Sequence, residues 1–364
     1  MNSATDITHV LKNTFLSIFP EAIPGSNGNI KLFSSFEEEY RALNKGVGVR
    51  SFAGKGILKL IGNEVLDFLH RISTNDVKNL GVYKLQRTLF TNEKGRLIDR
   101  SILMRIADYN LLIGESDDRS KLISWIEKYI IMEDIIVEDA SNDYSLFEIY
   151  GAQSHSFMTM LCGEKIDELN SGNIILGDTD SIKTYIAKVK ENDAIDKFLI
   201  MVNSADTISF VKYLYENRSA FDLKFIGDRS FNYFRIINGI PTAPNEINAK
   251  YNPHEINLIH EVSFKKGCYI GQEVIARLDT YDKVQKELKG VLFETEKMIE
   301  LPTTIFSIDG TEVGEVTSIE QGLDKKIIGL ALVRKKYMDP SNDLFIKIND
   351  EKVGIILSDF PVEE

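Results

Sequence analysis

The sequence predicts an α+β protein with antiparallel sheets that ends in a small β-barrel. Strand and helix patterns alternate up to about residue 288, and an antiparallel meander lies within this alternation. From about Lys289 onward helix patterns disappear. Short strands remain there, separated by turns at Asp309-Gly310 and Asn349-Asp350. We therefore expect two α+β parts followed by a barrel over residues 289–364.

Residues 1–29 predict a lead-in helix followed by a loop. Breakers from Pro24 to Asn29 end the helical pattern. Apolar residues recur before them at helical spacing: Ile7, Val10, Leu11, Phe15 and Ile18.

Residues 30–145 predict the first α+β part. A polar helix is expected at 36–44, and a strand at 57–60 lies between glycine-rich turns. Asn63 can cap the helix that follows, because its side chain can accept a hydrogen bond from a free N–H group at the helix start.

The meander occupies residues 83–115 of this first part. Its turns are expected at Asn92–Gly95 and Asp108–Asn110, where short breaker-rich runs separate apolar strands. A helix follows, and its apolar side is formed by Leu122, Ile126, Tyr129 and Ile130.

Residues 146–288 predict the second α+β part, with a boundary near residues 143–150. Strands are expected at 146–151, 183–189 and 197–202, and helical patterns lie near 155–161 and 207–217.

The charge of the chain excludes broad classes of partner. Its 55 acidic and 43 basic residues give a net charge of −12, which opposes sequence-independent binding to nucleic acid or to an anionic membrane. The N-terminus lacks the apolar region of a signal peptide, and no apolar run is long enough to span a membrane. We therefore expect a cytoplasmic protein without nucleic-acid or membrane partners.

Cysteine usage agrees with a reducing compartment. The chain has only Cys162 and Cys268, so it encodes neither a disulfide framework nor a Cys-x-x-Cys metal site. No metal site is expected.

The segment at residues 263–288 carries the chemical signal. Cys268 stands between Gly267 and Gly271, just ahead of a predicted short helix over residues 272–278. The positive end of that helix, with Lys265 and Lys266 nearby, favours a reactive thiolate.

Two alternatives stand beside the reactive thiol. A lone cysteine is otherwise a small buried hydrophobe. Nucleophilic hydrolysis would need a histidine base, and no histidine has a recognisable protease or amidase context, although His254 and His260 lie near in sequence.

Residues 266–273, Lys-Gly-Cys-Tyr-Ile-Gly-Gln-Glu, together with Arg277, resemble the motif of the YgfZ family of folate-binding proteins. Residues 235–241 and 253–258 resemble that family's Arg-x-x-x-Gly-x-Pro and Pro-Gln-Glu-x-x-Leu segments in the same order. His254 departs from the usual glutamine. The similarity extends over most of residues 45–290.

The resemblance implies a fold, a cofactor and partners. The family includes the mitochondrial assembly factor for iron–sulfur proteins. Its wider relatives, the glycine-cleavage T proteins, are aminomethyltransferases that hold tetrahydrofolate in the central channel of a three-domain fold. The implied architecture is two interleaved mixed α/β domains around a channel plus a C-terminal barrel. The implied partners are folate and iron–sulfur client or assembly proteins.

Two departures weigh against aminomethyl transfer. The transferases carry a Gly-Gly-x-x-Asp-Asp stretch whose aspartate lies beside the reactive folate nitrogen. Here Arg100 is aligned with the second aspartate, and a basic side chain cannot stabilise a cationic amine. Asp99 is the one local carboxylate left for that role. Residues 49–51, Val-Arg-Ser, stand where the transferases show Asp-x-Ser.

The resemblance also suggests roles for single residues, each with a structural alternative. Arg235 matches an arginine that approaches the acidic tail of the folate, or it forms a salt bridge between domains. Lys266 pairs with an anionic ligand or is solvated. Tyr269 stacks on a pteridine or packs in an interface. Gln272 and Glu273 are expected to cap the helix, and Arg277 to form an ion pair on its surface.

Three functions follow. The first is a folate-binding accessory protein that supports assembly or repair of iron–sulfur clusters, including those of tRNA-modifying enzymes. Two distant cysteines cannot supply the usual four thiolates, so Cys268 would act transiently, by redox exchange, bridging or shared ligation. The second is a tetrahydrofolate-dependent one-carbon transferase or demethylase. The third is a scaffold that has lost the ligand.

Overall fold

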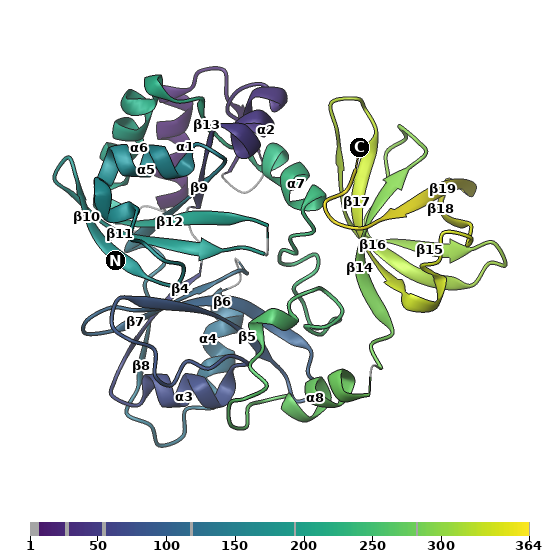
Figure 1. Cartoon of the computed structure of the whole chain (residues 1–364), viewed down its shortest axis with the longest axis horizontal. Helices are drawn as coiled ribbons and strands as arrows, with labels where there is room; N and C mark the ends of the chain where they lie inside the picture. The colour runs from purple at the N-terminus through teal and green to yellow at the C-terminus, as the bar shows by residue number, and fades with distance from the viewer. Residues whose placement is uncertain are drawn as a thin grey trace. The chain divides into compact units, whose positions relative to one another are not determined.

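The computed structural model describes residues 7–25, 29–52, 56–116, 119–192, 194–281 and 283–363 (Figure 1). The chain divides into two compact units. Unit 1 contains the described residues of Met1–Phe68, Val77–Arg87 and Ser101–Phe231, and unit 2 those of Leu69–Asp76, Thr88–Arg100 and Asn232–Glu364. Ser26–Gly28, part of the loop expected after the lead-in helix, lies outside the described residues. Among the described helices, none is long and apolar enough to cross a membrane.

Unit 1 is built on a six-stranded sheet in the order β10-β11-β12-β9-β3-β13. Neighbouring strands are antiparallel except for β13, which pairs in parallel with β3. The strands are β3 (Val47–Phe52), β9 (Tyr144–Tyr150), β10 (Ile174–Thr179), β11 (Ile182–Lys190), β12 (Asp196–Asn203) and β13 (Leu223–Phe225).

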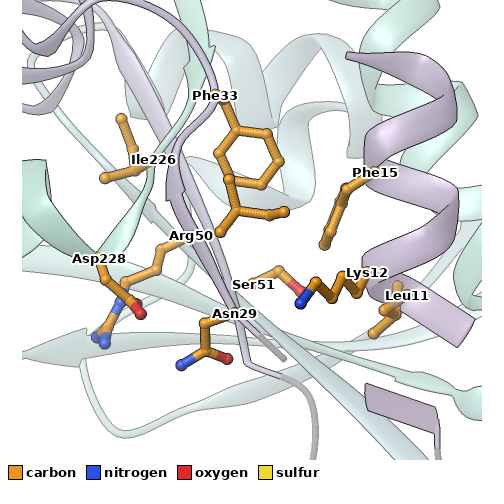
Figure 2. Close-up of a pocket in the computed structure, with 10 residues that line it drawn as sticks. Leu11, Lys12, Phe15, Asn29, Phe33, Arg50, Ser51, Ile226 and Asp228 are labelled. Atoms are coloured by element: carbon orange, nitrogen blue, oxygen red, sulfur yellow. The ribbon is translucent and has the colours of Figure 1, made fainter. Parts of the chain in front are cut away.

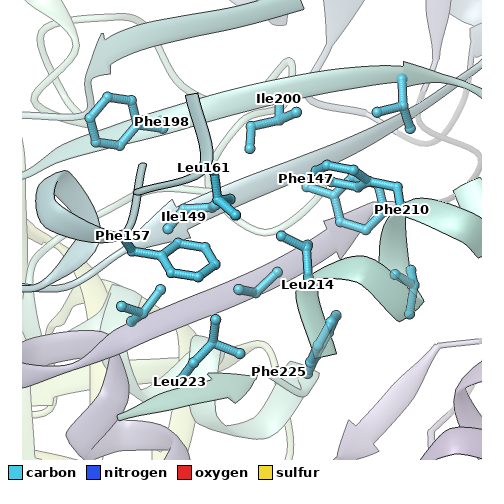
Figure 3. Close-up of a cluster of buried hydrophobic side chains, with 14 of the residues drawn as sticks. Phe147, Ile149, Phe157, Leu161, Phe198, Ile200, Phe210, Leu214, Leu223 and Phe225 are labelled. Atoms are coloured by element: carbon cyan, nitrogen blue, oxygen red, sulfur yellow. The ribbon is translucent and has the colours of Figure 1, made fainter. Parts of the chain in front are cut away.

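One face of this sheet is covered by helices. Figure 3 shows Phe157 and Leu161 of α5 and Phe210 and Leu214 of α6 within the buried cluster that includes Phe147 of β9. Leu11 and Phe15 of α1 belong to the same cluster. The helices of this unit are α1 (Ile7–Ile18), α2 (Phe36–Lys45), α4 (Arg119–Glu127), α5 (Ser154–Cys162) and α6 (Thr207–Glu216).

The other face of the six-stranded sheet packs on a second sheet, ordered β5-β6-β7-β4-β8. β12 therefore needs apolar residues on both faces, and its side chains alternate: Ile200 lies in the helix-side cluster, and Leu199 and Met201 lie between the sheets. The strands are β4 (Ile57–Ile61), β5 (Lys84–Thr91), β6 (Leu97–Arg105), β7 (Asn110–Gly114) and β8 (Ile136–Asp139). A short ribbon pairs β1 (Ile23–Pro24) with β2 (Ile30–Leu32).

Unit 2 contains a closed barrel in the order β14-β17-β16-β15-β18-β19, filled by apolar side chains. Its strands are β14 (Lys286–Phe293), β15 (Thr303–Ser307), β16 (Glu312–Gln321), β17 (Ile327–Arg334), β18 (Leu344–Ile348) and β19 (Glu351–Ser358). The helix α8 (Gln272–Thr280) precedes it. α3 (Val65–Ile72) and α7 (Asp228–Ile237) begin in unit 1 and end in unit 2.

The mixed α/β fold with a C-terminal barrel is confirmed. The lead-in helix and the helix after Asn63 form as α1 and α3, and the meander forms β5, β6 and β7. One helix is shorter than expected. α4 ends at Glu127, and tighter turns then place the amides of Tyr129 and Ile130 on the carbonyls of Ile126 and Glu127.

Candidate functional site

Cys268 lies in unit 2, in the loop between the 3₁₀ helix η4 (Ile259–Glu261) and α8. Its thiol is free and exposed, so the interpretation of Cys268 as a buried hydrophobe is wrong. The helix begins at Gln272, directly after the left-handed Gly271 (φ 84°), which places the cysteine ahead of the helix as expected. Residues 266–271 are called the thiol loop below.

Lys266 holds the beginning of the thiol loop. Its side chain is buried, and its ammonium donates to the carbonyls of Ser73 (2.6 Å), Asn75 (3.0 Å) and His70. These carbonyls belong to the end of α3 and the residues after it, within unit 2. Burial lowers the pKa of Lys266 to about 8. The three carbonyl contacts make Lys266 an anchor of the loop.

Gly271 holds the other end. A Cβ atom at this position would lie 2.6 Å from the carbonyl oxygen of Asn92 and 3.0 Å from the Cα of Gly95, so only glycine fits against the β5–β6 turn. Next to it, the hydroxyl of Thr91 donates to the carbonyl of Ile270 at 2.6 Å. By contrast, a Cβ at Gly267 would meet nothing within 4 Å. The thiol is thus exposed on a loop held at both ends.

Tyr269 points inward from the same loop. Its side chain is 7% exposed, and its hydroxyl has no hydrogen-bond partner among the described residues. Burial raises the pKa of Tyr269 to about 12, so the hydroxyl keeps its proton at neutral pH and can donate a hydrogen bond. A buried hydroxyl without a partner is costly, and Tyr269 therefore marks a position where a ligand or a water molecule would be favoured.

Arg100, which the resemblance sets against the second transferase aspartate, forms a buried ion pair. Arg100 is buried and donates from Nη2 to Oε1 of Glu261 at 2.6 Å and from Nε at 3.0 Å. Asp99 beside it is buried, and its Oδ1 accepts the backbone N–H of Arg100 at 2.8 Å. A bidentate pair of this kind satisfies both the guanidinium of Arg100 and the carboxylate of Glu261.

Arg235 lies in a second buried network of unit 2. It is 3% exposed and donates to Oε2 of Glu246 (3.2 Å), to Oγ of Ser318 (2.7 Å) and to Oδ1 of Asn232 (2.9 Å). Glu246 is fully buried, and it also accepts hydrogen bonds from the hydroxyls of Thr317 and Ser318 on β16. Arg235 therefore forms a salt bridge with Glu246, and both residues lie in unit 2, so this ion pair does not join two domains as the structural alternative expected.

The remaining motif residues make fewer contacts. The capping hydrogen bonds expected from Gln272 and Glu273 are not found within the described structure, where Gly271 closes the turn and the amide of Gln272 bonds to the carbonyl of Tyr269 at 3.2 Å. Arg277 is exposed in the last turn of α8 and forms no ion pair with another described residue.

The partners of the two buried arginines, Glu246 and Glu261, are not among the residues predicted from the sequence. The sequence contains a signal that such partners exist, because a basic residue within the apolar pattern of a strand or helix needs a buried hydrogen-bond acceptor. Across the part of the chain that the structure describes, no group of three or more histidine, cysteine, aspartate or glutamate side chains could hold a metal ion.

Comparison with known proteins identifies relatives over most of the chain. The family model described as "GCVT N-terminal domain" matches residues 17–266. A protein of Arabidopsis thaliana named "Putative transferase At1g60990, chloroplastic" is 24% identical over 344 residues, which cover 92% of this chain and 76% of the relative. The aminomethyltransferase of Staphylococcus haemolyticus is 22% identical over 327 residues, 88% of each chain.

A solved structure has the same fold. The glycine cleavage system aminomethyltransferase T from Bartonella henselae superposes with a TM-score of 0.76 at 17% sequence identity, covering 90% of this chain and 89% of that one. At this identity the likeness concerns the fold.

Proposed function

Because the chain belongs to the GCVT N-terminal domain family, we propose that it is a cytoplasmic folate-binding accessory protein that supports assembly or repair of iron–sulfur clusters. Its clients would include enzymes that modify tRNA. Cys268 is the functional thiol, acting transiently on a client or assembly protein rather than holding a cluster within this chain.

The thiol loop carries this proposal. An exposed free thiol on a surface loop is chemically available, and the contacts of Lys266 and Gly271 give it a defined position. Lys265 and Phe264 are exposed in the residues just before the loop, and they offer a charged and an apolar contact to a protein partner.

The Arg100–Glu261 pair favours the accessory role over aminomethyl transfer. Transfer from an amine needs a carboxylate that stabilises positive charge as it develops. The buried guanidinium of Arg100 opposes that charge, and the carboxylate of Glu261 is already neutralised by it.

The expected tetrahydrofolate contacts fit in part. Tyr269 fits a polar ligand, because its buried hydroxyl has no partner among the described side chains and backbone groups. Arg235 and Lys266 fit poorly as partners for an acidic tail, because their donors are engaged by Glu246, Ser318 and backbone carbonyls. When bound, the folate would supply a carrier for one-carbon groups.

The thiol is tested in cells that lack the gene for this chain. Activity of iron–sulfur enzymes is measured after expression of the wild type, Cys268→Ser or Cys162→Ser. Cys162 is the matched control, because it is half-buried in unit 1 and burial raises its thiol pKa. We expect Cys162→Ser to restore activity and Cys268→Ser not to. Full restoration by Cys268→Ser would exclude the thiol mechanism.

Folate binding is tested by calorimetry with tetrahydrofolate. We expect Tyr269→Phe to weaken binding by about tenfold, since a hydrogen bond to a buried donor is lost. Tyr281→Phe is the control, because Tyr281 is exposed. Absence of binding by the wild type would leave only the scaffold function.

A second candidate is a tetrahydrofolate-dependent aminomethyltransferase or demethylase. The name of the Staphylococcus haemolyticus relative favours it, and Asp99 is the carboxylate that would serve it. The purified protein is incubated with a methylated amine, saturating tetrahydrofolate and a dye that accepts two electrons, because oxidation of the methyl carbon to the methylene level releases two electrons. Formation of methylene-tetrahydrofolate, lost in Asp99→Asn, would establish this activity, and no turnover would exclude it.

A further inference from the structure

Unit 1 contains a small cavity that has room for water only. Residues of α1, β2 and β3 line it, among them Phe15, Phe33 and Ser51, and its volume is about 30 Å³ (Figure 2). A volume of this size holds water but is far below the space that an organic ligand occupies. An organic ligand therefore does not fit there, whereas the outer surface of unit 1 offers a larger feature.

The apolar pattern of α4 continues beyond the end of the helix. Ile126 in the last turn is fully buried, and the helix ends at Glu127. Residues 129–132, Tyr-Ile-Ile-Met, follow as an apolar run. Because the chain leaves the helix there, this run does not extend the buried side of α4. Ile131 is 83% exposed and Met132 is 92% exposed.

Other apolar side chains lie beside this exposed pair. Trp125 and Tyr129 are half-buried, and their ring centroids are 5.0 Å apart. Ile136 begins the edge strand β8 and is 55% exposed. The name α4–β8 patch is used for these residues, which lie on or between two elements labelled in Figure 1: Trp125, Tyr129, Ile130, Ile131, Met132 and Ile136. Contiguous exposed apolar surface marks interaction sites, and Trp, Tyr and Met are enriched at the centres of interfaces.

Hydrogen bonds hold the exposed part of the patch in a defined conformation. Oε2 of Glu133 accepts the backbone N–H groups of Ile131 at 2.9 Å and of Met132 at 3.1 Å. The N–H group of Asp134 donates to Oε2 of Glu64 at 2.9 Å, which ties the segment to the residues before α3. A partner therefore meets apolar side chains on an ordered backbone, and this lowers the entropic cost of binding.

The charged groups around the α4–β8 patch have a negative balance. Six carboxylates flank it: Glu64, Glu127, Glu133, Asp134, Glu138 and Asp139. Three lysines flank it: Lys59, Lys121 and Lys128. Lys59 pairs with Glu138 at 3.3 Å. Three excess negative charges therefore remain beside the apolar surface.

This balance selects among the partners that an apolar surface can take. A second copy bound by a two-fold axis through the same patch would place two acidic rims against each other. An anionic membrane would be repelled in the same way. The complementary surface is an apolar stripe with cations along its sides, which an amphipathic basic helix presents.

We propose that the α4–β8 patch docks an amphipathic helix of a partner protein, with lysine or arginine residues beside the apolar side of that helix. Ile131, Met132 and Trp125 contact the apolar side, and the carboxylates around them bind the cations. The patch lies in unit 1 and the thiol loop in unit 2, and this docking does not depend on the function proposed for Cys268.

The test uses the fluorescence of Trp125, the one tryptophan of the chain, in the full-length protein. The probe is a short amphipathic helical peptide of leucine and lysine. Its matched control has glutamate in place of each lysine. We expect the lysine peptide to bind at micromolar concentration and to shift the emission of Trp125 to shorter wavelength. The glutamate peptide should bind at least tenfold more weakly, and salt should weaken the lysine peptide only in part, because apolar contact is not screened.

Matched variants locate the peptide. The double variant Ile131→Ser with Met132→Ser is expected to weaken binding by about tenfold or more, because two apolar side chains are no longer buried by the peptide. The control is Met298→Ser with Ile308→Ser, which changes side chains that are 87% and 67% exposed in unit 2 and should bind as the wild type does. Circular dichroism checks that each variant is folded.

A charge variant tests the acidic rim. Glu127→Gln with Asp134→Asn removes two exposed carboxylates and leaves the apolar side chains in place. We expect several-fold weaker binding of the lysine peptide at low salt and little difference from the wild type at high salt. Binding to Cys268→Ser should match the wild type, because the thiol takes no part.

Four results would overturn the proposal. The first is that the lysine peptide leaves the emission of Trp125 unchanged. The second is that the glutamate peptide binds as tightly. The third is that the Ile131 and Met132 double variant binds as well as its control. The fourth is that phosphatidylcholine vesicles, or dimerisation of the protein itself in sedimentation, shift the emission while the lysine peptide does not, which would assign the patch to a membrane or to a second copy.

Discussion

At the scale of single residues, the two glycines of the thiol loop differ in what they require. Gly271 has a positive φ, and a Cβ atom added there would lie too close to backbone atoms of the β5–β6 turn. A Cβ atom added at Gly267 would meet no atom within 4 Å. We expect Gly271→Ala to lower the free energy of unfolding by about 2 kcal/mol or more. The alanine would hold its backbone in the strained left-handed conformation, and its Cβ would push the β5–β6 turn away.

Urea unfolding of both alanine variants measures this difference. Gly267→Ala is the control and should change the free energy of unfolding by less than about 0.5 kcal/mol. Equal stability of the two variants would contradict the close approach between Gly271 and Gly95.

Lys266 and Lys265 form a second matched pair. Lys266→Met would leave three carbonyls without their shared donor, and we expect a loss of about 1–3 kcal/mol in stability. Lys265→Met should have little effect, because that side chain is exposed. Chemical denaturation gives the stabilities, and a stable Lys266→Met protein would show that the thiol loop does not depend on this anchor.

At the scale of elements, the Arg235 network links the end of α7 to β16 within unit 2. Arg235→Ala leaves the carboxylate of Glu246 buried without its cation, and we expect a destabilisation of about 3–5 kcal/mol. Arg277→Ala on the surface of α8 is the control. A double variant with Glu246→Gln should recover part of the loss, since it removes the unpaired charge.

This expected loss affects how binding data are interpreted. Weak folate binding by Arg235→Ala would follow from a disturbed unit 2 as readily as from a missing ligand contact. The Tyr269→Phe comparison avoids this ambiguity, because it removes a hydroxyl that has no partner among the described residues. Thermal unfolding of each variant therefore accompanies every binding measurement.

The local sequence pattern predicted the helices and strands well, but it did not predict which side chains contact one another. The spacing of Leu11 and Phe15 indicated α1, and the glycines around Cys268 indicated a loop before α8, because both signals lie within a few residues. The acceptors of Lys266 lie more than 190 positions away, and Glu261 lies 161 positions from Arg100. Such pairs depend on the folded path of the chain, which periodicity does not contain.

At the scale of the whole molecule, the negative net charge opposes binding to nucleic acid. With a charge of −12, we expect no binding to tRNA tighter than about 10⁻⁴ M at physiological salt. Fluorescence anisotropy with a labelled tRNA measures this. Micromolar binding that weakens steeply with salt would contradict the expectation and would indicate a basic surface. A role in tRNA modification would then be direct rather than through client enzymes.

Holding the thiol loop at both ends lowers the entropic cost of an encounter at Cys268. A mobile segment loses conformational freedom when a partner binds, typically about 0.5–1.5 kcal/mol for each side chain that is immobilised. The contacts of Lys266 and Gly271 order this backbone before any partner arrives. The cost of ordering an encounter with Cys268 therefore falls mainly on the partner, which must bring its reacting atom to a thiol whose position is already defined.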